Sequence, residues 1–144
     1  MFTVRRILVP IDDTPLANRA LDAGLTLAER FDAHLFPLHV RQSADEERPD
    51  VDDDLIATEL LAVEGTVRAR LREGHSLAFD HIHPLVMTGE PADIIVLAAE
   101  QNGCDVIVMG THGRHGLYDW LYGSTTEQVL KRTKAAMVVL RDLE

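Results

Sequence analysis

The segment CDVIVMGTHGRHGLYDWLYGS, residues 104–124, contains the pattern that decides the fold class. Its apolar run Val106–Met109 is typical of a strand that is buried on both faces of a sheet. The connection that follows, Gly110–Ser124, is much longer than the roughly 2 to 6 residues usual between a strand and a helix. A helix is predicted to begin at about Ser124 and to end at about Thr133. The segment therefore predicts one strand–helix unit of an α/β fold, with an unusually long connection.

The same alternation of strand and helix extends toward the N-terminus. The run Arg6–Ile11 predicts a buried strand, and Thr14 and Pro15 suit the N-cap and the first position of a helix. Apolar residues then recur at spacings of three and four from Ala17 to Phe31, as in an amphipathic helix. The remaining predictions are strands at His34–Val40, Phe79–Met87 and Met137–Leu140, and helices at Asp54–Glu73 and from Pro91 to Gly103.

Five strands and four helices in this order predict one α/β domain over residues 1–144, with a doubly wound, Rossmann-like fold. Strands that are apolar on both faces favour a mainly parallel five-stranded sheet with helices on both faces. In such a fold, ligands bind at the carboxyl ends of the strands, near the point where the strand order reverses. The long connection leaves one of these strand ends at Met109, so we expect the ligand there.

Composition and charge limit the functions that this chain can have. Of its 144 residues, 46% are hydrophobic and 26% are charged, which is typical of a folded globule. The formal net charge of -10 opposes binding to nucleic acid or to anionic lipid. Cys104 has no partner cysteine, and the apolar run near the N-terminus is too short for a signal peptide or a membrane span. We therefore expect a cytoplasmic protein with neither a nucleic-acid nor a membrane partner.

The glycines of the long connection favour a phosphate site. Gly110 and Gly113 permit a tight turn and a close approach of bare backbone amides. Gly123 and Ser124 place a small residue and a hydroxyl at the predicted helix N-terminus, where anions bind. An alternative needs no ligand, because Ser124 and Glu127 also form the pattern of a capping box. Because the glycines follow a buried strand in a long connection, we favour phosphate binding.

The spacing of these glycines resembles the ATP-binding signature of the universal stress protein family, the UspA-like domains. That likeness extends over essentially the whole chain and keeps the order of the family's motifs. The matching stretches are Gly110-x2-Gly113-x9-Gly123-Ser124, RILVPID at residues 6–12, the strand that ends at Val40, GEPA at residues 89–92 and MVVL at residues 137–140. The resemblance implies a stress-response protein that binds an adenine nucleotide, ATP, and acts as a sensor or regulatory module.

The resemblance also assigns ligand positions. Adenine and ribose would be bordered by Pro10, Ile11, Asp12, Val40, Met109 and Gly110. The phosphates would be held by Gly113, Arg114, Gly123, Ser124, Thr125 and Thr126. Arg114, the only Lys or Arg of the connection, would supply the charged contact. Asp13 stands where the family commonly has glycine, and its carboxylate could either help to hold a Mg²⁺ on the phosphates or repel them.

Three other groups of residues carry weaker signals. Tyr118, Trp120 and Tyr122 place three aromatic rings in the connection, where they could close over the ligand, meet a partner, or pack the connection onto the sheet. The acidic run Asp45–Asp54 is most simply a solvated loop, with a partner-facing or gating segment as the alternative. Cys104 is predicted to be a small buried hydrophobe rather than a nucleophile.

Two pairs of histidines have a spacing that could allow them to share a metal ion. His81 and His83 alternate on one face of a predicted strand, and His112 and His115 lie in the long connection. Neither pair has a convincing third ligand, so the simpler interpretation of the strand pair is an ordinary polar face. Contact with phosphate is an alternative for the pair in the connection. We therefore predict no metal site formed by protein ligands alone.

The competing functions differ in what is done with the ligand. A phosphoacceptor receiver domain shares the acidic pair Asp12–Asp13, but here the third and fifth predicted strands do not end in the aspartate and lysine that it requires. A slow ATPase or a phosphotransfer enzyme is a second alternative, although few residues could act as base or nucleophile. A ligand-free dimeric interaction module is the third. The family resemblance implies a homodimer through the last strand, Met137–Leu140, which would otherwise be an exposed edge.

Overall fold

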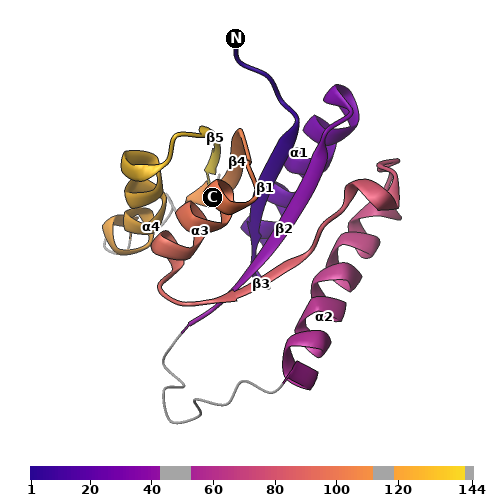
Figure 1. The fold of residues 1–144 in the computed structure, drawn as a ribbon, viewed down its shortest axis with the longest axis horizontal. Coiled ribbons are helices and arrows are strands. Elements are labelled where there is room, and N and C mark those ends of the chain that lie inside the picture. Colours follow the sequence, from indigo (N-terminus) through magenta and orange to yellow (C-terminus); the bar gives the residue numbers. More distant parts are fainter. Residues whose placement is uncertain (43–52, 112–118, 142–144) are drawn as a thin grey trace.

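The fold comes from a computed structural model that describes residues 1–42, 53–111 and 119–141, with only the backbone given for residues 119–124. Strands and helices alternate along the described chain (Figure 1). Their order is β1 (Arg6–Ile11), α1 (Pro15–Phe31), β2 (His34–Arg41), α2 (Asp53–Leu71), η2 (Phe79–His81), β3 (Leu85–Thr88), α3 (Pro91–Gln101), β4 (Val106–Thr111), α4 (Asp119–Arg132) and β5 (Ala136–Arg141). The predicted alternation is confirmed.

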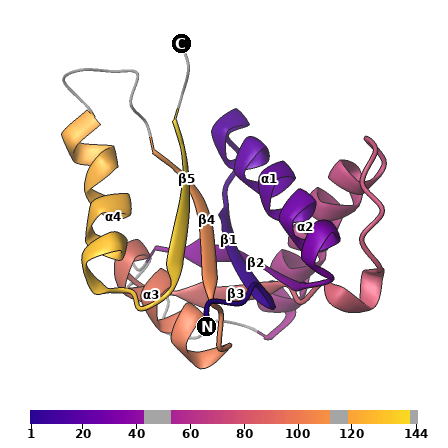
Figure 2. The same ribbon diagram turned by 90° about the horizontal axis from the view of Figure 1, so that it is seen from above.

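The five strands form one sheet in the order β3-β2-β1-β4-β5, and every pair of neighbours is parallel. Because all strands run the same way, their carboxyl ends lie along one side of the sheet, which we call the carboxyl edge. Figure 2 shows α1 and α2 on one face of the sheet and α3 and α4 on the other. This arrangement is the predicted doubly wound α/β fold, and the strand order reverses between β1 and β4.

A hydrophobic core lies on each face of the sheet. Ile7 and Val9 of β1 pack on one side with residues of α1 such as Leu21. Leu8 of β1 packs on the other side with residues of α3 such as Ile95. Successive side chains of a strand point to opposite faces, so the central strand β1 is covered by helices on both sides. This explains why its sequence is a continuous apolar run.

Helices α1 and α3 begin at signals that are visible in the sequence. Thr14 Oγ1 accepts a hydrogen bond from the backbone N–H of Ala17 at 3.2 Å, and a proline opens the first turn. In the same way the Glu90 carboxylate accepts from the backbone N–H of Asp93 at 3.1 Å. Each helix follows directly on a strand, so both N-termini lie at the carboxyl edge.

The predicted strand Phe79–Met87 is wrong in its first half. That half forms the short 3-10 helix η2, and only the second half joins the sheet as β3. Pro84 explains the late start of β3, because a proline has no N–H to donate to a neighbouring strand. Before Pro84, only Ile82 pairs with the sheet, through a single bridge to Leu35 of β2.

The last helix begins earlier than the sequence predicts. Helix α4 begins at Asp119, so Gly123 and Ser124 lie inside it, and the prediction of a helix N-terminus and capping box at Ser124 is wrong. Trp120 and Tyr122 are also part of the helical backbone rather than of the connection. Tyr118 lies outside the described residues.

Candidate functional site

A pocket with a volume of about 600 Å³ opens at the carboxyl edge of the sheet. It is formed by the ends of β1, β2 and β4 together with the first turns of α1 and α3 and part of α4. The lining residues are Pro10, Ile11, Asp12, Thr14, Leu16, Ala17, His39, Val40, Gln42, Pro91, Ile95, Met109, Gly110, Thr125 and Thr126. The pocket therefore lies where the strand order reverses, which is the predicted place for a ligand.

The inner wall of the pocket is apolar. Met109 of β4 and Ile95 of α3 are 6% and 3% exposed, and Leu16 and Ala17 at the start of α1 are also buried. The polar residues Asp12 and Gln42 of the lining are exposed. An apolar wall with a few polar groups at the mouth suits a flat ring that carries polar substituents.

Asp12 is held by the turn between β1 and α1. Its Oδ1 accepts a hydrogen bond from the backbone N–H of Thr14 at 2.9 Å and a second one from the Thr14 hydroxyl. The same hydroxyl oxygen accepts the N–H of Ala17, so Thr14 fixes the carboxylate and the helix start together. A carboxylate held in this way is an ordered acceptor, suited to the hydroxyl groups of a ligand.

Gly110 of β4 contacts two helices, α4 through Thr126 and α1 through Leu16. The Thr126 hydroxyl donates to the backbone carbonyl of Gly110 at 3.1 Å. A Cβ atom placed on Gly110 would lie 2.5 Å from Leu16 Cγ, so the glycine makes room for α1. Gly110 is a strand residue and is absent from the glycines with positive φ. Its role in the described structure is close packing, and the tight turn predicted for it is not observed.

The structure brings most of the predicted ligand positions together. Eight of the twelve line the pocket, namely Pro10, Ile11, Asp12, Val40, Met109, Gly110, Thr125 and Thr126. Gly123 and Ser124 belong to the first part of α4, residues 119–124, for which only the backbone is described. Gly113 and Arg114 lie outside the described residues, as do His112, His115 and most of the acidic run. The last two residues of that run, Asp53 and Asp54, begin α2.

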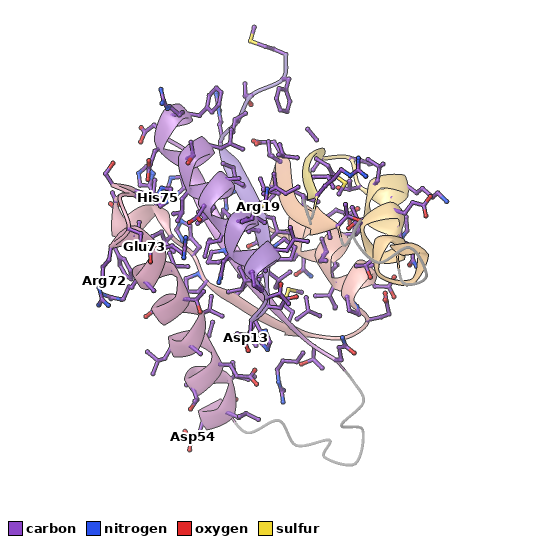
Figure 3. The ribbon with its side chains drawn as sticks, turned by 180° about the vertical axis from the view of Figure 1, so that it is seen from behind. Asp13, Arg19, Asp54, Arg72, Glu73 and His75 are labelled. Carbon is purple, nitrogen blue, oxygen red and sulfur yellow. The ribbon has the colours of Figure 1, made fainter. Side chains whose placement is uncertain are left out.

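Sequence reasoning missed seven lining residues, which come from α1, α3 and the end of β2. They are Thr14, Leu16, Ala17, His39, Gln42, Pro91 and Ile95. Thr14 and Pro91 were recognised only as helix-start signals. A signal did exist, because the first turn of a helix that follows a strand of this sheet always lies at the carboxyl edge. Asp13, by contrast, is exposed and is not part of the lining (Figure 3).

The structure bears on the histidine and cysteine interpretations in the part of the chain that it describes. There, no group of three or more His, Cys, Asp or Glu residues is arranged to hold a metal ion. His81 and His83 do not form an ordinary polar face, since both rings stack on His34 of β2. Cys104 is buried, and burial raises the pKa of its thiol to about 12, as expected for an inert hydrophobe. None of the described helices is long and apolar enough to cross a membrane.

Comparisons with known proteins place the chain among relatives of the same fold. Universal stress protein MJ0531 of Methanocaldococcus jannaschii is 30% identical over 141 residues, which cover 95% of this chain and 82% of that protein. The solved structure of MJ0577 from the same organism has a TM-score of 0.74 at 25% identity, with 99% of both chains covered.

Two further solved structures contain a nucleotide. A universal stress protein in complex with cAMP has a TM-score of 0.69 at 21% identity, covering 96% of this chain and 97% of that one. The universal stress protein of Archaeoglobus fulgidus in complex with dAMP has a TM-score of 0.60 at 20% identity, covering 96% and 98%. At these identities the two structures show the shared fold. The model of the universal stress protein family matches residues 3–141, and this chain therefore belongs to the universal stress protein family.

Proposed function

We propose that this stress-response protein binds an adenine nucleotide, ATP, in the pocket at the carboxyl edge, and that it acts as a sensor or regulatory module. The observation that carries the proposal is the pocket itself. It lies at the reversal of the strand order, and it gathers eight positions that the family resemblance assigns to ATP. The complexes of two structural neighbours with cAMP and dAMP support an adenine nucleotide as the ligand class.

The base and the ribose fit the part of the pocket formed by β1, β2 and β4. Adenine would lie against the apolar wall near Met109 and Ile95, both almost fully buried. The backbone near Val40 would meet its edge, with Pro10 and Ile11 beside it. Asp12, already ordered by Thr14, would accept hydrogen bonds from the ribose hydroxyls.

The phosphates would lie toward α4 and the preceding connection. Thr126 already donates its hydroxyl proton to Gly110, so the donors for the phosphates must come from other groups. Thr125 lines the pocket and offers such a hydroxyl. We propose that Arg114, the Ser124 hydroxyl and the amides near Gly113 complete this set, with Gly123 leaving room for the phosphates beside α4. We assign no protein carboxylate to a Mg²⁺ ion on the phosphates, because Asp12, the acidic residue of the described lining, is assigned to the ribose.

A binding role is favoured over catalysis because the described lining offers few groups for proton transfer. Asp12 has one carboxylate oxygen occupied by two hydrogen bonds from Thr14. His39 is the other titratable side chain of the described lining. A general base must reach the attacking water while held by a third group, and no such relay is visible among these residues. The alternative is slow ATP hydrolysis. A measurement of phosphate release tests it directly.

We also propose that the protein forms a cytoplasmic homodimer through β5. Within the described residues, this strand lies at the end of the sheet and pairs with β4 alone. Val138 and Val139 are 37% and 38% exposed along it. An uncovered strand edge readily pairs with another strand, and a second copy of β5 is the simplest partner in a symmetric assembly.

The decisive experiment combines ligand analysis with titration. Mass analysis of the purified protein identifies any retained nucleotide, and ATP is then titrated into the wild type and into Gly113→Val. The added side chain should block the phosphate approach and weaken binding by about tenfold or more, which is about 1.4 kcal/mol. Gly65→Val on α2 is the matched control, since a Cβ there has no neighbour within 4 Å.

The result that abandons the proposal is a wild type that carries no nucleotide and binds no ATP at millimolar concentration. Equal affinity of Gly113→Val and wild type would instead reject only the assignment of the phosphate contacts. Phosphate release, followed in parallel with saturating ATP and Mg²⁺, separates the sensor from the slow ATPase.

A further inference from the structure

Three histidines form a stack at the amino-terminal side of the sheet, opposite the pocket. His34 is the first residue of β2, His81 ends η2, and His83 lies between η2 and β3. The rings of His34 and His81 are 4.2 Å apart and nearly parallel, at 10°. The rings of His34 and His83 are 5.1 Å apart at 28°. Residues that are far apart in the sequence thus bring three titratable rings into direct contact.

Two hydrogen bonds involve ring nitrogens of the stack, one between two histidines and one to a backbone carbonyl. His34 Nδ1 and His83 Nε2 are 2.9 Å apart and share one hydrogen bond. His81 Nδ1 lies 3.1 Å from the carbonyl oxygen of Ala33, which can only accept, so Nδ1 carries the proton. Phe36 also stacks on His83, with the ring centroids 4.9 Å apart, and is 3% exposed.

The charges around the stack disfavour additional protons. Burial lowers the pKa of His83, and the neighbouring His34, Arg6 and His81 lower it further. The guanidinium of Arg6 lies over the Phe36 ring at 4.7 Å. Asp80 acts in the opposite direction on His83, but with the smallest effect of these groups.

Two carboxylates near the stack, those of Asp32 and Asp80, do little to stabilise protonated rings. Asp32 Oδ1 is 3.8 Å from His81 Nδ1, and its side chain is 94% exposed, so solvent screens it. Asp80 of η2 is exposed as well.

The stack fastens a strap, which we define as residues 77–84, to the edge of β2. Besides the His34–His83 bond, the backbone N–H of His83 donates to the carbonyl of Leu35 at 2.8 Å. Under the strap, Leu77 and Ile82 are 9% and 7% exposed and belong to the core on the α1 side. Release of the strap would therefore expose the apolar side chains of Leu77 and Ile82 and the amino-terminal end of β2.

We propose that the His34–His83 pair is an acid-sensitive clasp, which holds the strap on β2 at neutral pH and releases it when both rings carry a proton. The pair keeps its hydrogen bond with no added proton or with one, because a neutral ring can accept from a charged one. A second proton removes the only acceptor and places two positive rings in contact. Protonation of His81 leaves its bond to Ala33 intact, so this ring does not open the clasp.

The direction of the pH effect follows from the lowered pKa of His83. In the released strap the ring regains the ordinary histidine pKa of about 6.5. Between that value and the lower pKa of the fastened state, the released strap binds more protons, so acid favours release. The fastened state is thus fully favoured above about pH 7 and weakens as the pH falls through 6.

Hydrogen exchange of single amides tests the clasp in the whole protein. The reporter is the N–H of residue 83, bonded to Leu35, and the internal control is the N–H of Gly89, bonded to Arg41 at 2.8 Å. Protection factors, corrected for intrinsic exchange rates, are compared at pH 7.5 and pH 5.5. We expect the reporter in the wild type to lose about tenfold in protection, with the control amide unchanged.

Three variants separate the pair from the histidine content of the cluster. His83→Gln and His34→Gln keep a side-chain amide at the bonded position but cannot be protonated, so the acid-dependent loss should disappear. His81→Gln removes a histidine of the same stack and should keep the loss. The proposal is overturned if the wild-type reporter loses no more protection than Gly89, or if His83→Gln loses as much as the wild type.

A second measurement on the wild type is independent of whether the variants fold. The Cε1–H resonances of His34 and His83 are followed by NMR from pH 8 to pH 4. The His83 ring should titrate below the ordinary histidine value of about 6.5, because burial and the neighbouring positive groups lower its pKa. Two independent titrations at the ordinary histidine value would overturn the proposal.

Discussion

At the residue scale, the tightest packing beside the pocket is between Gly110 and Leu16. A Cβ on Gly110 would approach Leu16 Cγ to 2.5 Å and Cδ2 to 2.8 Å. Gly110→Ala should therefore push α1 away from β4 and lower the free energy of unfolding by about 1–3 kcal/mol, the usual cost of overpacking. Urea denaturation of the two proteins measures the difference.

Two further variants show whether the lower free energy of unfolding comes from the contact with Leu16. Gly65→Ala on α2 meets no neighbour within 4 Å and should gain about 0.5–1 kcal/mol, since alanine is the better helix residue. In a Leu16→Ala background the clash is absent, so Gly110→Ala should cost much less there. If Gly110→Ala is as stable as the wild type, the close packing of Leu16 does not constrain this position.

Cys104 supplies a second prediction at this scale. The residue is 9% exposed, and burial raises the pKa of its thiol to about 12. The unfolded chain loses the thiol proton first, so the protein should lose stability as the pH rises from about 9 toward 12. At pH 8 an aromatic disulfide reagent should label the native protein at least about a hundredfold more slowly than the urea-unfolded protein. Rapid labelling of the native protein would show that the thiol is accessible.

At the scale of elements, α2 is attached by few buried residues, because only Val63 and Val67 of its 19 residues are buried. An ion pair supports it near its C-terminal end, beside Glu73 and His75 in Figure 3. Arg70 donates from Nε and Nη2 to the two carboxylate oxygens of Asp22 on α1, at 2.8 and 2.6 Å. Such a two-bond pair is stronger than a single contact between long side chains.

A double-mutant cycle with Arg70→Gln and Asp22→Asn measures this attachment. We expect a coupling energy of about 1 kcal/mol that decreases in 1 M salt, because both side chains are partly exposed. The ion pair of Arg132 with Asp93 between α4 and α3 is the matched control. Its side chains are 41% and 61% exposed, so its coupling should be smaller. Equal couplings for the two pairs would contradict the role given to Arg70.

How far the elements could be predicted depends on whether their signals are local. The start of α1 was predicted correctly because Thr14 and Pro15 act within one turn. Phe31 fits the helical spacing of that helix and yet is 56% exposed, since the spacing does not show where the partner layer ends. The prediction of a strand over Phe79–Met87 was wrong for the part before Pro84. It rested on the pattern of side chains, which does not show that Pro84 lacks the backbone N–H that a neighbouring strand would need.

The site divides in the same way. Asp12 and Val40, at the ends of β1 and β2, were assigned to the ligand by the family resemblance, and the topology brings both strand ends to one edge. Leu16 and His39 were missed, since their contribution depends on how α1 and β2 lie around the pocket. Thr126 was predicted as a phosphate ligand, and its bond to Gly110 could only be found in three dimensions.

At the scale of the whole molecule, the parallel sheet separates the proposed roles in space. The pocket occupies the carboxyl edge, and the histidine stack lies at the opposite ends of the strands. The edge strand β5 is remote from the stack, because β1 and β4 separate it from β2, on which His34 lies. The histidine stack can therefore be altered by substitution without direct contact with the pocket or with β5. Strand β5, by contrast, pairs with the pocket strand β4, where Val139 lies opposite Met109.

The proposed homodimer gives the prediction at this scale. Val139→Lys places a charge on the uncovered edge, where lysine opposes strand pairing. We expect the wild type to sediment as a dimer and Val139→Lys as a folded monomer, with its helical circular dichroism unchanged. Leu61→Lys on α2 is the control, since Leu61 is 67% exposed and lies on the opposite side of the sheet order. A wild type that is monomeric at 100 μM, or a Val139→Lys variant that remains dimeric, would rule out assembly through β5.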